Sequence, residues 1–248
     1  MDISLSIIVP ALNEAKNIEA AIAGAKRSLA EANITNVEFL VMTCLDRDLK
    51  SDGTVDIVRK LAEQDPRIRS IHVDGYQKLG EKYRNAVRLA TKEYCLMIPG
   101  DNENDPASFP VIFSNIGKAD MVVSYTSNPE ERPLYRRIIS KTYTTCLNIL
   151  FLHRMPYYNG INVYRSEDLR NALPQTDSFA YAAEILLTLL KQKKTYVVVP
   201  ARVQFRFGKT KALGWNSLKS VIAAILRLRT RLAFKRPSSS GVESEDKG

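Results

Sequence analysis

The stretch CLMIPGDNENDP, residues 95–106, passes directly from an apolar strand into a run of acidic and amide side chains. The residues that follow Gly100 are Asp101, Asn102, Glu103, Asn104 and Asp105. Three carboxylates cannot stay close together at neutral pH without positive charge, and a divalent cation is a common source of it. Mg²⁺ and Mn²⁺ prefer such oxygen ligands and commonly keep phosphate oxygens in their coordination shell. The stretch therefore predicts a metal and phosphate site at the end of a buried strand.

A simpler interpretation of an acidic loop is a solvated turn whose Asp side chain caps the next helix, expected over 106–116. An isolated loop of this kind would favour that interpretation. This loop is not isolated, because polar loops at 10–14 and 43–54 also follow apolar runs directly.

The first hundred residues alternate between apolar strands and amphipathic helices. Strands are expected at 4–9, 37–43, 68–73 and 94–98, and helices at 13–32, 55–64 and 79–91. This alternation predicts an α/β fold with a mostly parallel central sheet flanked by helices. Ligands of such sheets bind outside the carboxyl ends of the strands. The three polar loops lie at such ends, so we expect them to form one site.

The second half of the chain has a less regular pattern. Strands are expected at 121–125 and 195–199, helices at 134–151, 181–191 and 217–234, and a turn at 159–165. We expect a single domain over 1–236, which ends in a basic amphipathic helix at about 217–236. The small polar residues of 237–248 predict a disordered tail.

Composition limits the class of protein. The 248 residues are 45% hydrophobic and 25% charged, as in a globular protein, and the net charge of +9 favours an anionic partner, although it could serve solubility alone. Three cysteines without paired spacing indicate a reducing compartment rather than a disulfide framework. No stretch reaches the about 18 apolar residues that span a bilayer, and the N-terminal apolar run is too short for a signal peptide. The glycine-containing segment at 74–82 lacks the GK[ST] of a phosphate loop, and neither histidine lies in a motif of a hydrolase triad. We expect a cytoplasmic protein.

The helix expected at 217–236 combines apolar residues at helical spacing with many arginines and lysines. Its apolar residues are Leu218, Val221, Ile222, Ile225 and Leu232. This pattern favours peripheral attachment to an anionic membrane surface on its cytoplasmic face. The alternative is a helix packed on the sheet with a solvated basic face. Nucleic acid is not an expected partner, because Phe234 is the sole aromatic residue available for stacking in this helix.

The order of several short motifs resembles family 2 glycosyltransferases, which have the GT-A nucleotide-diphospho-sugar transferase fold. Within the family, the chain resembles the polyprenyl-phosphate sugar synthases of the dolichol-phosphate mannose type. The family's motifs are VPxxNE at 9–14, DGT at 52–54, DxD as Asp101-Asn102-Glu103, an Arg-rich acceptor helix at 135–141, an SGF-type turn at 159–165 and a late basic segment at 205–213. The resemblance covers about residues 4 to 215.

The resemblance implies an inverting, metal-dependent hexosyltransferase of cell-envelope biogenesis. A GDP- or UDP-hexose would be the donor, polyprenyl phosphate at the membrane surface the acceptor, and Mg²⁺ or Mn²⁺ the cofactor. The nucleotide-binding residues would be Pro10, Asn13, Glu14, Asp46, Asp48 and Asp101. The metal ligands would be Asp101, Glu103 and Asp105. Arg206 and Lys211 would reach the donor or acceptor phosphates, and Arg136 and Ser140 would hold the acceptor phosphate.

Two positions depart from the family pattern. Arg47 stands where the usual DDGS loop has its first Asp, which affects base selection, and Tyr125 stands where prenyl-phosphate synthases carry an Arg, which affects the acceptor. One alternative is a transferase of the same fold that acts on a saccharide hydroxyl in cell-envelope polysaccharide assembly, with Asp105 as the base. Another is a nucleotide-sugar-binding protein without catalysis.

Overall fold

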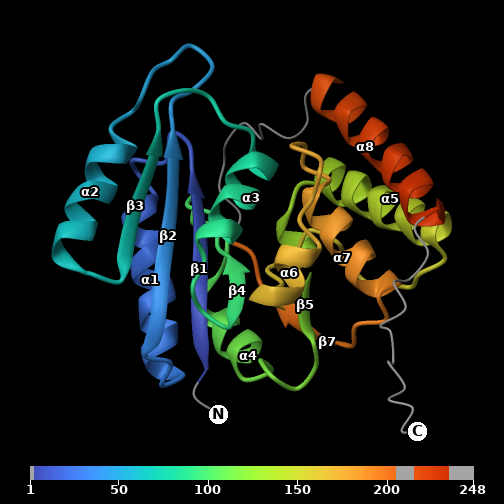
Figure 1. Ribbon diagram of the computed structural model, residues 1–248, viewed down its shortest axis with the longest axis horizontal. Coiled ribbons are helices and arrows are strands. Elements are labelled where there is room, and N and C mark those ends of the chain that lie inside the picture. Colours follow the sequence, from blue (N-terminus) through green and yellow to red (C-terminus); the bar gives the residue numbers. More distant parts are fainter. Residues whose placement is uncertain (1–2, 205–214, 235–248) are drawn as a thin grey trace, which may run out of the picture.

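A computed structural model describes residues 3–204 and 215–234, and it contains one seven-stranded sheet between two layers of helices (Figure 1). The strands are β1 (Ser4–Ala11), β2 (Asn36–Cys44), β3 (Ile68–Val73), β4 (Tyr94–Met97), β5 (Met121–Thr126), β6 (Val163–Arg165) and β7 (Tyr196–Ala201). Their order in the sheet is β3-β2-β1-β4-β6-β5-β7. Only β6 runs antiparallel to its neighbours among these strands. The expected α/β fold with a mostly parallel sheet is confirmed.

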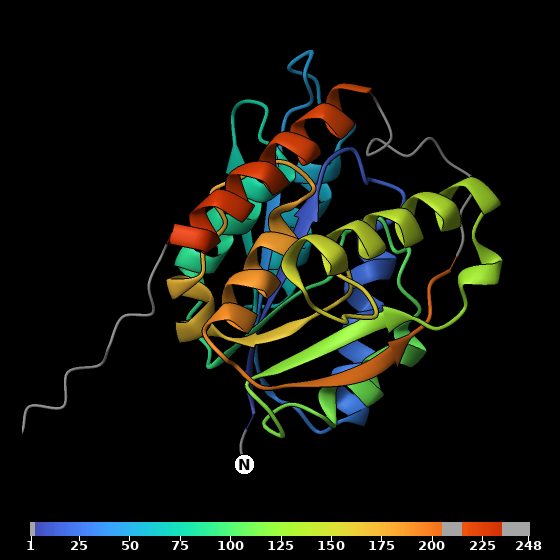
Figure 2. The ribbon, with the colours of Figure 1, turned by 90° about the vertical axis from the view of Figure 1, so that its right-hand side faces the viewer.

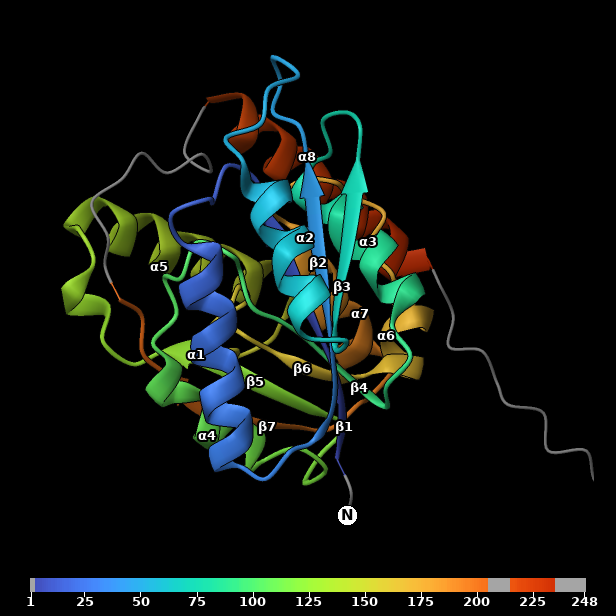
Figure 3. The ribbon, with the colours of Figure 1, turned by 90° about the vertical axis from the view of Figure 1, so that its left-hand side faces the viewer.

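The helices cover both faces of the sheet. One face carries α1 (Ile18–Glu31), α2 (Thr54–Gln64) and α4 (Phe109–Phe113) (Figure 3). The other carries α3 (Leu79–Leu89), α5 (Leu134–Phe151), α6 (Ser166–Asn171), α7 (Tyr181–Lys191) and α8 (Trp215–Phe234). Successive residues of a strand point to opposite faces, so Ile7 packs in the first core cluster and Ile8 in the second.

Three local expectations were wrong. The first helix begins at Ile18 rather than at residue 13, because Asn13 has a left-handed backbone (φ 56°) and the following loop bonds to other segments. The helix expected at 106–116 is a 3₁₀ helix, η1 (Pro106–Ser108), followed by the short α4, since Pro110 lacks the N–H that a continuous helix would need. The turn expected at 159–165 contains strand β6, whose three residues are too few to show an alternating pattern.

The carboxyl ends of β1, β2, β4, β5 and β7 lie at one edge of the sheet, because these strands all run in the same direction. The acidic loop follows β4 at this edge. Helix α5 follows β5 there, after a second 3₁₀ helix, η2 (Pro129–Glu131). This arrangement brings the first turn of α5 close to the acidic loop.

Helix α8 packs against α7 (Figure 2). Leu228 is buried, and Ile225 and Leu232 are partly buried against the second core cluster. Arg231 forms an ion pair of 2.7 Å with buried Glu184 of α7. Much of the apolar side that was expected to face a membrane therefore contacts protein, while Ile222 and Leu226 remain exposed.

Within the described residues, every helix is too short or too polar to cross a membrane.

Candidate functional site

The loop after β1 meets the loop after β2 through Asn13 and Asp46. The Nδ2 of Asn13 donates to Oδ2 of Asp46 at 3.4 Å; Asn13 is exposed and Asp46 is half-buried. The N–H groups of Lys50 and Asp48 donate to Oδ1 of Asp46, each at 2.9 Å. These bonds hold the pKa of Asp46 below its usual value, and the bond from Lys50 contributes most. The expected nucleotide residues Asn13 and Asp46 are thus brought together, whereas Asp48 contributes its backbone.

A second set of bonds fixes the loop after β1 to the start of α2. The N–H of Glu14 donates to Oγ1 of Thr54 at 2.8 Å, and the N–H of Ala15 donates to Oδ2 of Asp52 at 3.0 Å. Burial raises the pKa of Asp52, but the bonds from Thr54 and Ala15 outweigh it and leave the pKa below its usual value. The DGT segment at 52–54 therefore shapes the loop that carries Asn13 and Glu14. Pro10 is buried within β1.

The acidic loop packs tightly against the end of β1. A Cβ on Gly100 would lie 2.9 Å from Cδ1 of Ile18 and 3.3 Å from the carbonyl oxygen of Pro10, so a larger residue would force these neighbours to shift. Asn102 is left-handed (φ 56°), a conformation that Asn tolerates better than most residues. The resulting turn lets the N–H of Glu103 donate to Oδ1 of Asp101 at 3.0 Å.

Asp105 has structural contacts. Its Oδ1 accepts the N–H of Ala107 at 3.0 Å and caps η1, and its Oδ2 lies 3.7 Å from Nε of Arg202. The expected turn that caps the next helix is therefore present at this residue. Its roles as a metal ligand and as a base remain predictions.

Arg136, in the first turn of α5, faces the acidic loop. Its Nη1 lies 3.8 Å from Oε1 of Glu103, and its side chain is 14% exposed. Ser140 lies one turn later on the same face of α5 and is half-buried. Nearby, Nη1 of Arg132 donates to the hydroxyl of Tyr157 at 3.4 Å. Two arginines, Arg136 and Arg202, thus lie beside carboxylates of the acidic loop.

Lys82 is a site residue that the sequence interpretation missed. It lies on the inner face of α3, is 3% exposed, and its Nζ donates to the carbonyl oxygen of Ala11 at 3.1 Å. A lysine at a core position of an amphipathic helix is the signal that could have identified it. The predicted phosphate-binding residues Arg206 and Lys211 lie outside the described residues.

The residue types of the acidic loop fit a divalent cation that also binds phosphates. Asp101 and Glu103 supply hard oxygen ligands, and Mg²⁺ or Mn²⁺ commonly completes its shell with water and substrate phosphates. Within residues 3–204 and 215–234, no set of three or more Asp, Glu, His or Cys side chains is arranged to hold a metal. Asp101 and Glu103 would thus hold such a cation together with the oxygens of a nucleotide diphosphate.

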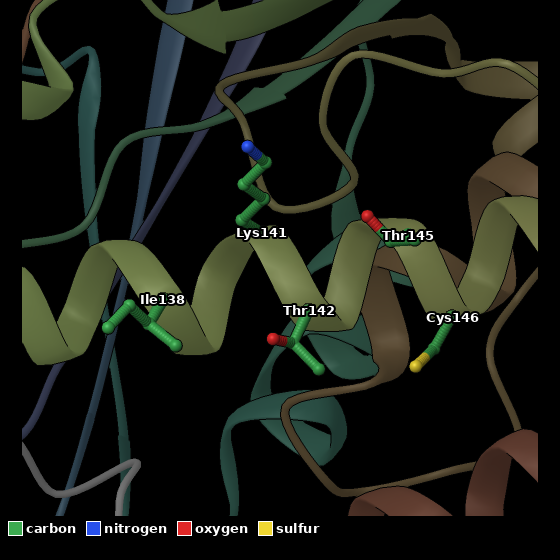
Figure 4. A pocket seen from close by; sticks show the side chains of 5 residues that line it. All are labelled: Ile138, Lys141, Thr142, Thr145 and Cys146. Carbon is green, nitrogen blue, oxygen red and sulfur yellow. The ribbon is translucent and has the colours of Figure 1, made fainter.

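The solvent side of α5 is unusually apolar. Of its eighteen residues, Leu147 alone is buried. A stripe at helical spacing, which we call the outer stripe, faces solvent and consists of Leu134, Ile138, Thr142, Thr145, Ile149 and Leu152. Ile138, Thr142 and Thr145 line a groove of about 320 Å³ together with Lys141 and Cys146 (Figure 4). Exposed apolar residues in such a row indicate a contact surface.

A mostly parallel α/β sheet with polar loops, acidic residues and arginines at its carboxyl edge is the arrangement expected of an enzyme that binds phosphorylated ligands. The sequence model of the family described as "Glycosyl transferase family 2" matches residues 6–173, and the chain belongs to this family of enzymes. It is a glycosyltransferase with the GT-A fold. No curated protein sequence matches the chain.

Solved structures of similar fold are glycosyltransferases. Mannosyl-3-phosphoglycerate synthase from Rubrobacter xylanophilus has a TM-score of 0.69 at 16% identity, over 97% of this chain and 78% of that chain. Glucosyl-3-phosphoglycerate synthase from Mycobacterium tuberculosis, in complex with Mn²⁺, UDP and glucosyl-3-phosphoglycerate, has a TM-score of 0.67 at 17% identity, over 92% and 80%. S. aureus TarS 1–349 in complex with UDP-GlcNAc has a TM-score of 0.66 at 16% identity, over 93% and 66%. At these identities the likeness concerns the fold alone.

Proposed function

We propose that this glycosyltransferase moves a hexose, with inversion, from a nucleotide-diphosphate sugar to polyprenyl phosphate at a membrane surface. The observation that carries the proposal is the approach of Arg136 to Glu103 at 3.8 Å. A cation suited to an acceptor phosphate thereby lies beside a carboxylate suited to the metal of a donor diphosphate. A phosphate acceptor is already an anion and needs no strong general base.

The donor side uses the loops after β1, β2 and β4. Asn13 and Asp46 offer an amide and a carboxylate to the base and ribose. Asp101 follows β4, which lies in the sheet between β1 and β5, so Asp101 stands between the loop of Asn13 and helix α5. Mg²⁺ or Mn²⁺ held by Asp101 and Glu103 would stabilise the charge on the leaving diphosphate. Similar folds have been solved with Mn²⁺ and UDP or with UDP-GlcNAc, which supports a nucleotide sugar as the donor.

The membrane part of the proposal is supported by α5 more than by α8. The outer stripe is exposed, with Leu134 at 65%, Ile149 at 70% and Leu152 at 87%. Exposed Arg137 and Lys141 lie next to it, and neither α5 nor α8 contains an Asp or Glu. An apolar row bordered by cations suits an anionic lipid surface on the cytoplasmic side.

A second candidate acceptor is a small phosphorylated acid. Two of the similar folds are synthases whose names specify phosphoglycerate, and the same Arg136 could bind such a phosphate. In that case a hydroxyl would attack the sugar, and it would need a base within about 3 Å. A saccharide hydroxyl acceptor has the same requirement.

A donor screen by thermal shift, with UDP- and GDP-hexoses and with or without Mn²⁺, tests the donor. Transfer assays with polyprenyl phosphate, 3-phosphoglycerate and an oligosaccharide then test the acceptor. We expect turnover with the prenyl phosphate that falls about a hundredfold or more in Glu103→Ala. Transfer to the hydroxyl acceptors alone would reject the prenyl-phosphate proposal, and binding without any turnover would favour a non-catalytic protein.

A further inference from the structure

Glu103 and Arg136 have different partners in the proposed function, but here they face each other. The pair spans 3.8 Å, and its side chains are 35% and 14% exposed. Partial burial lowers the local dielectric and makes such a contact stronger than one in open water. A carboxylate that attracts an arginine is a weaker ligand for a second cation, and an arginine that attracts a carboxylate is a weaker ligand for a phosphate.

The backbone is fixed on both sides of this pair. The carbonyl oxygen of Glu103 accepts the N–H of Gln204 at 2.7 Å, and the next residue, Asn104, forms a β-bridge with Val203. Asn128, just before η2, holds Val203 through two bonds of 2.9 Å. These bonds join the acidic loop to the segment after β7 and to the segment before α5. Because the backbone is held in this way, Glu103 and Arg136 would exchange partners by moving their side chains alone.

We propose that the ion pair between Glu103 and Arg136 couples the donor and acceptor sites. Glu103 is more available to a divalent cation when Arg136 holds a phosphate, and Arg136 is more available to a phosphate when Glu103 holds a cation. The inference rests on the proposed function of the two residues. The first ligand to bind, cation or phosphate, must overcome the attraction between Glu103 and Arg136, and the second ligand then binds without this cost. Binding of one therefore strengthens binding of the other, and linkage makes the effect reciprocal.

The first test measures Mn²⁺ affinity of the full chain by electron paramagnetic resonance, in the presence of UDP or GDP. Arg136→Met is compared with Arg137→Met, which removes the same charge from the same helix at an exposed position. We expect Arg136→Met to bind Mn²⁺ about two- to fivefold more tightly than Arg137→Met, the range of a partly exposed ion pair. Equal affinities would mean that only net charge matters and would overturn the inference while leaving the proposed function intact.

The reciprocal test measures binding of inorganic phosphate without metal, by calorimetry. Glu103→Gln is compared with Glu130→Gln, an exposed residue of η2 that carries the same charge. We expect Glu103→Gln to bind phosphate more tightly by a similar factor, and equal affinities would again overturn the coupling. A wild-type chain that binds neither Mn²⁺ nor nucleotide would overturn both the proposed function and this inference.

Discussion

Asp105 and Glu103 stand two positions apart, but their surroundings differ. Asp105 caps η1 and lies near Arg202, whereas the side chain of Glu103 points toward Arg136. We expect Asp105→Ala to lower the free energy of unfolding by about 1 kcal/mol, the usual effect of a lost cap, with transfer activity near that of the wild type. Urea denaturation and steady-state kinetics check this. If Asp105→Ala lost as much activity as Glu103→Ala, Asp105 would act in the reaction after all.

Lys82 is a buried cation beneath the donor loops. A hydrogen bond from a charged group contributes about 1.5–3 kcal/mol, and this one fixes the carbonyl of Ala11 at the end of β1. We expect Lys82→Met to weaken binding of the preferred nucleotide about tenfold, measured by calorimetry. Arg88→Met removes the same charge from an exposed position of α3 and should leave the affinity unchanged. Similar losses in both variants would exclude a positioning role for Lys82.

At the scale of elements, Glu38 of β2 connects four segments. Its Oε1 accepts the hydroxyl of Ser6 at 2.7 Å and the N–H of Thr91 at 2.6 Å, and its Oε2 accepts from Arg69 at 2.9 Å. Burial raises the pKa of Glu38, but these hydrogen bonds outweigh it and leave the pKa below 4.5. The ionised carboxylate therefore stabilises the junction of β1, β2, β3 and the turn before β4.

Glu38→Gln should lower the free energy of unfolding by about 2 kcal/mol at pH 7. Because the folded pKa is depressed, the contribution is fully present above the unfolded pKa and is lost as the pH falls through the folded value. The difference between wild type and Glu38→Gln should thus be constant from pH 6 to 8, roughly, and shrink below about pH 4.5. Urea denaturation across this range tests it, and a difference that does not depend on pH would contradict the electrostatic account.

The elements that the sequence predicted well are those with strong local periodicity. The helices at 134–151 and 181–191 and the strand at 68–73 have the expected bounds, because each carries a repeated apolar pattern. Strand β6 could not be predicted, since its place between β4 and β5 depends on pairing between distant segments. The Glu103–Arg136 contact is equally non-local. The motifs indicated that both residues belong to the site but could not show that they face each other.

At the scale of the whole molecule, the two longest helices, α5 and α8, contain no acidic residue and lie in the same layer, and α5 exposes its outer stripe. A helix that packs on a core normally turns polar residues outward. Here the inner face of α5 carries Arg136 and Ser140 toward the site, and the opposite face is apolar. The exposed stripe is therefore the feature that most strongly favours a surface-bound enzyme over one that acts on a soluble acceptor.

Replacing two residues of the outer stripe by acid tests this orientation. Ile138→Asp with Ile149→Asp places charge where we expect lipid, and both side chains are more than half exposed, so the fold should tolerate the change. Binding to vesicles of phosphatidylcholine and phosphatidylglycerol, measured by sedimentation, should fall at least about tenfold below that of Leu49→Asp with Leu89→Asp, which has the same charge change elsewhere. Equal losses of vesicle binding in the two double variants would mean that net charge alone, and not the outer stripe, attracts the protein to the vesicles. If the wild-type protein did not bind such vesicles, a soluble phosphorylated acceptor would be favoured, because an enzyme with a lipid-linked acceptor must act at the bilayer.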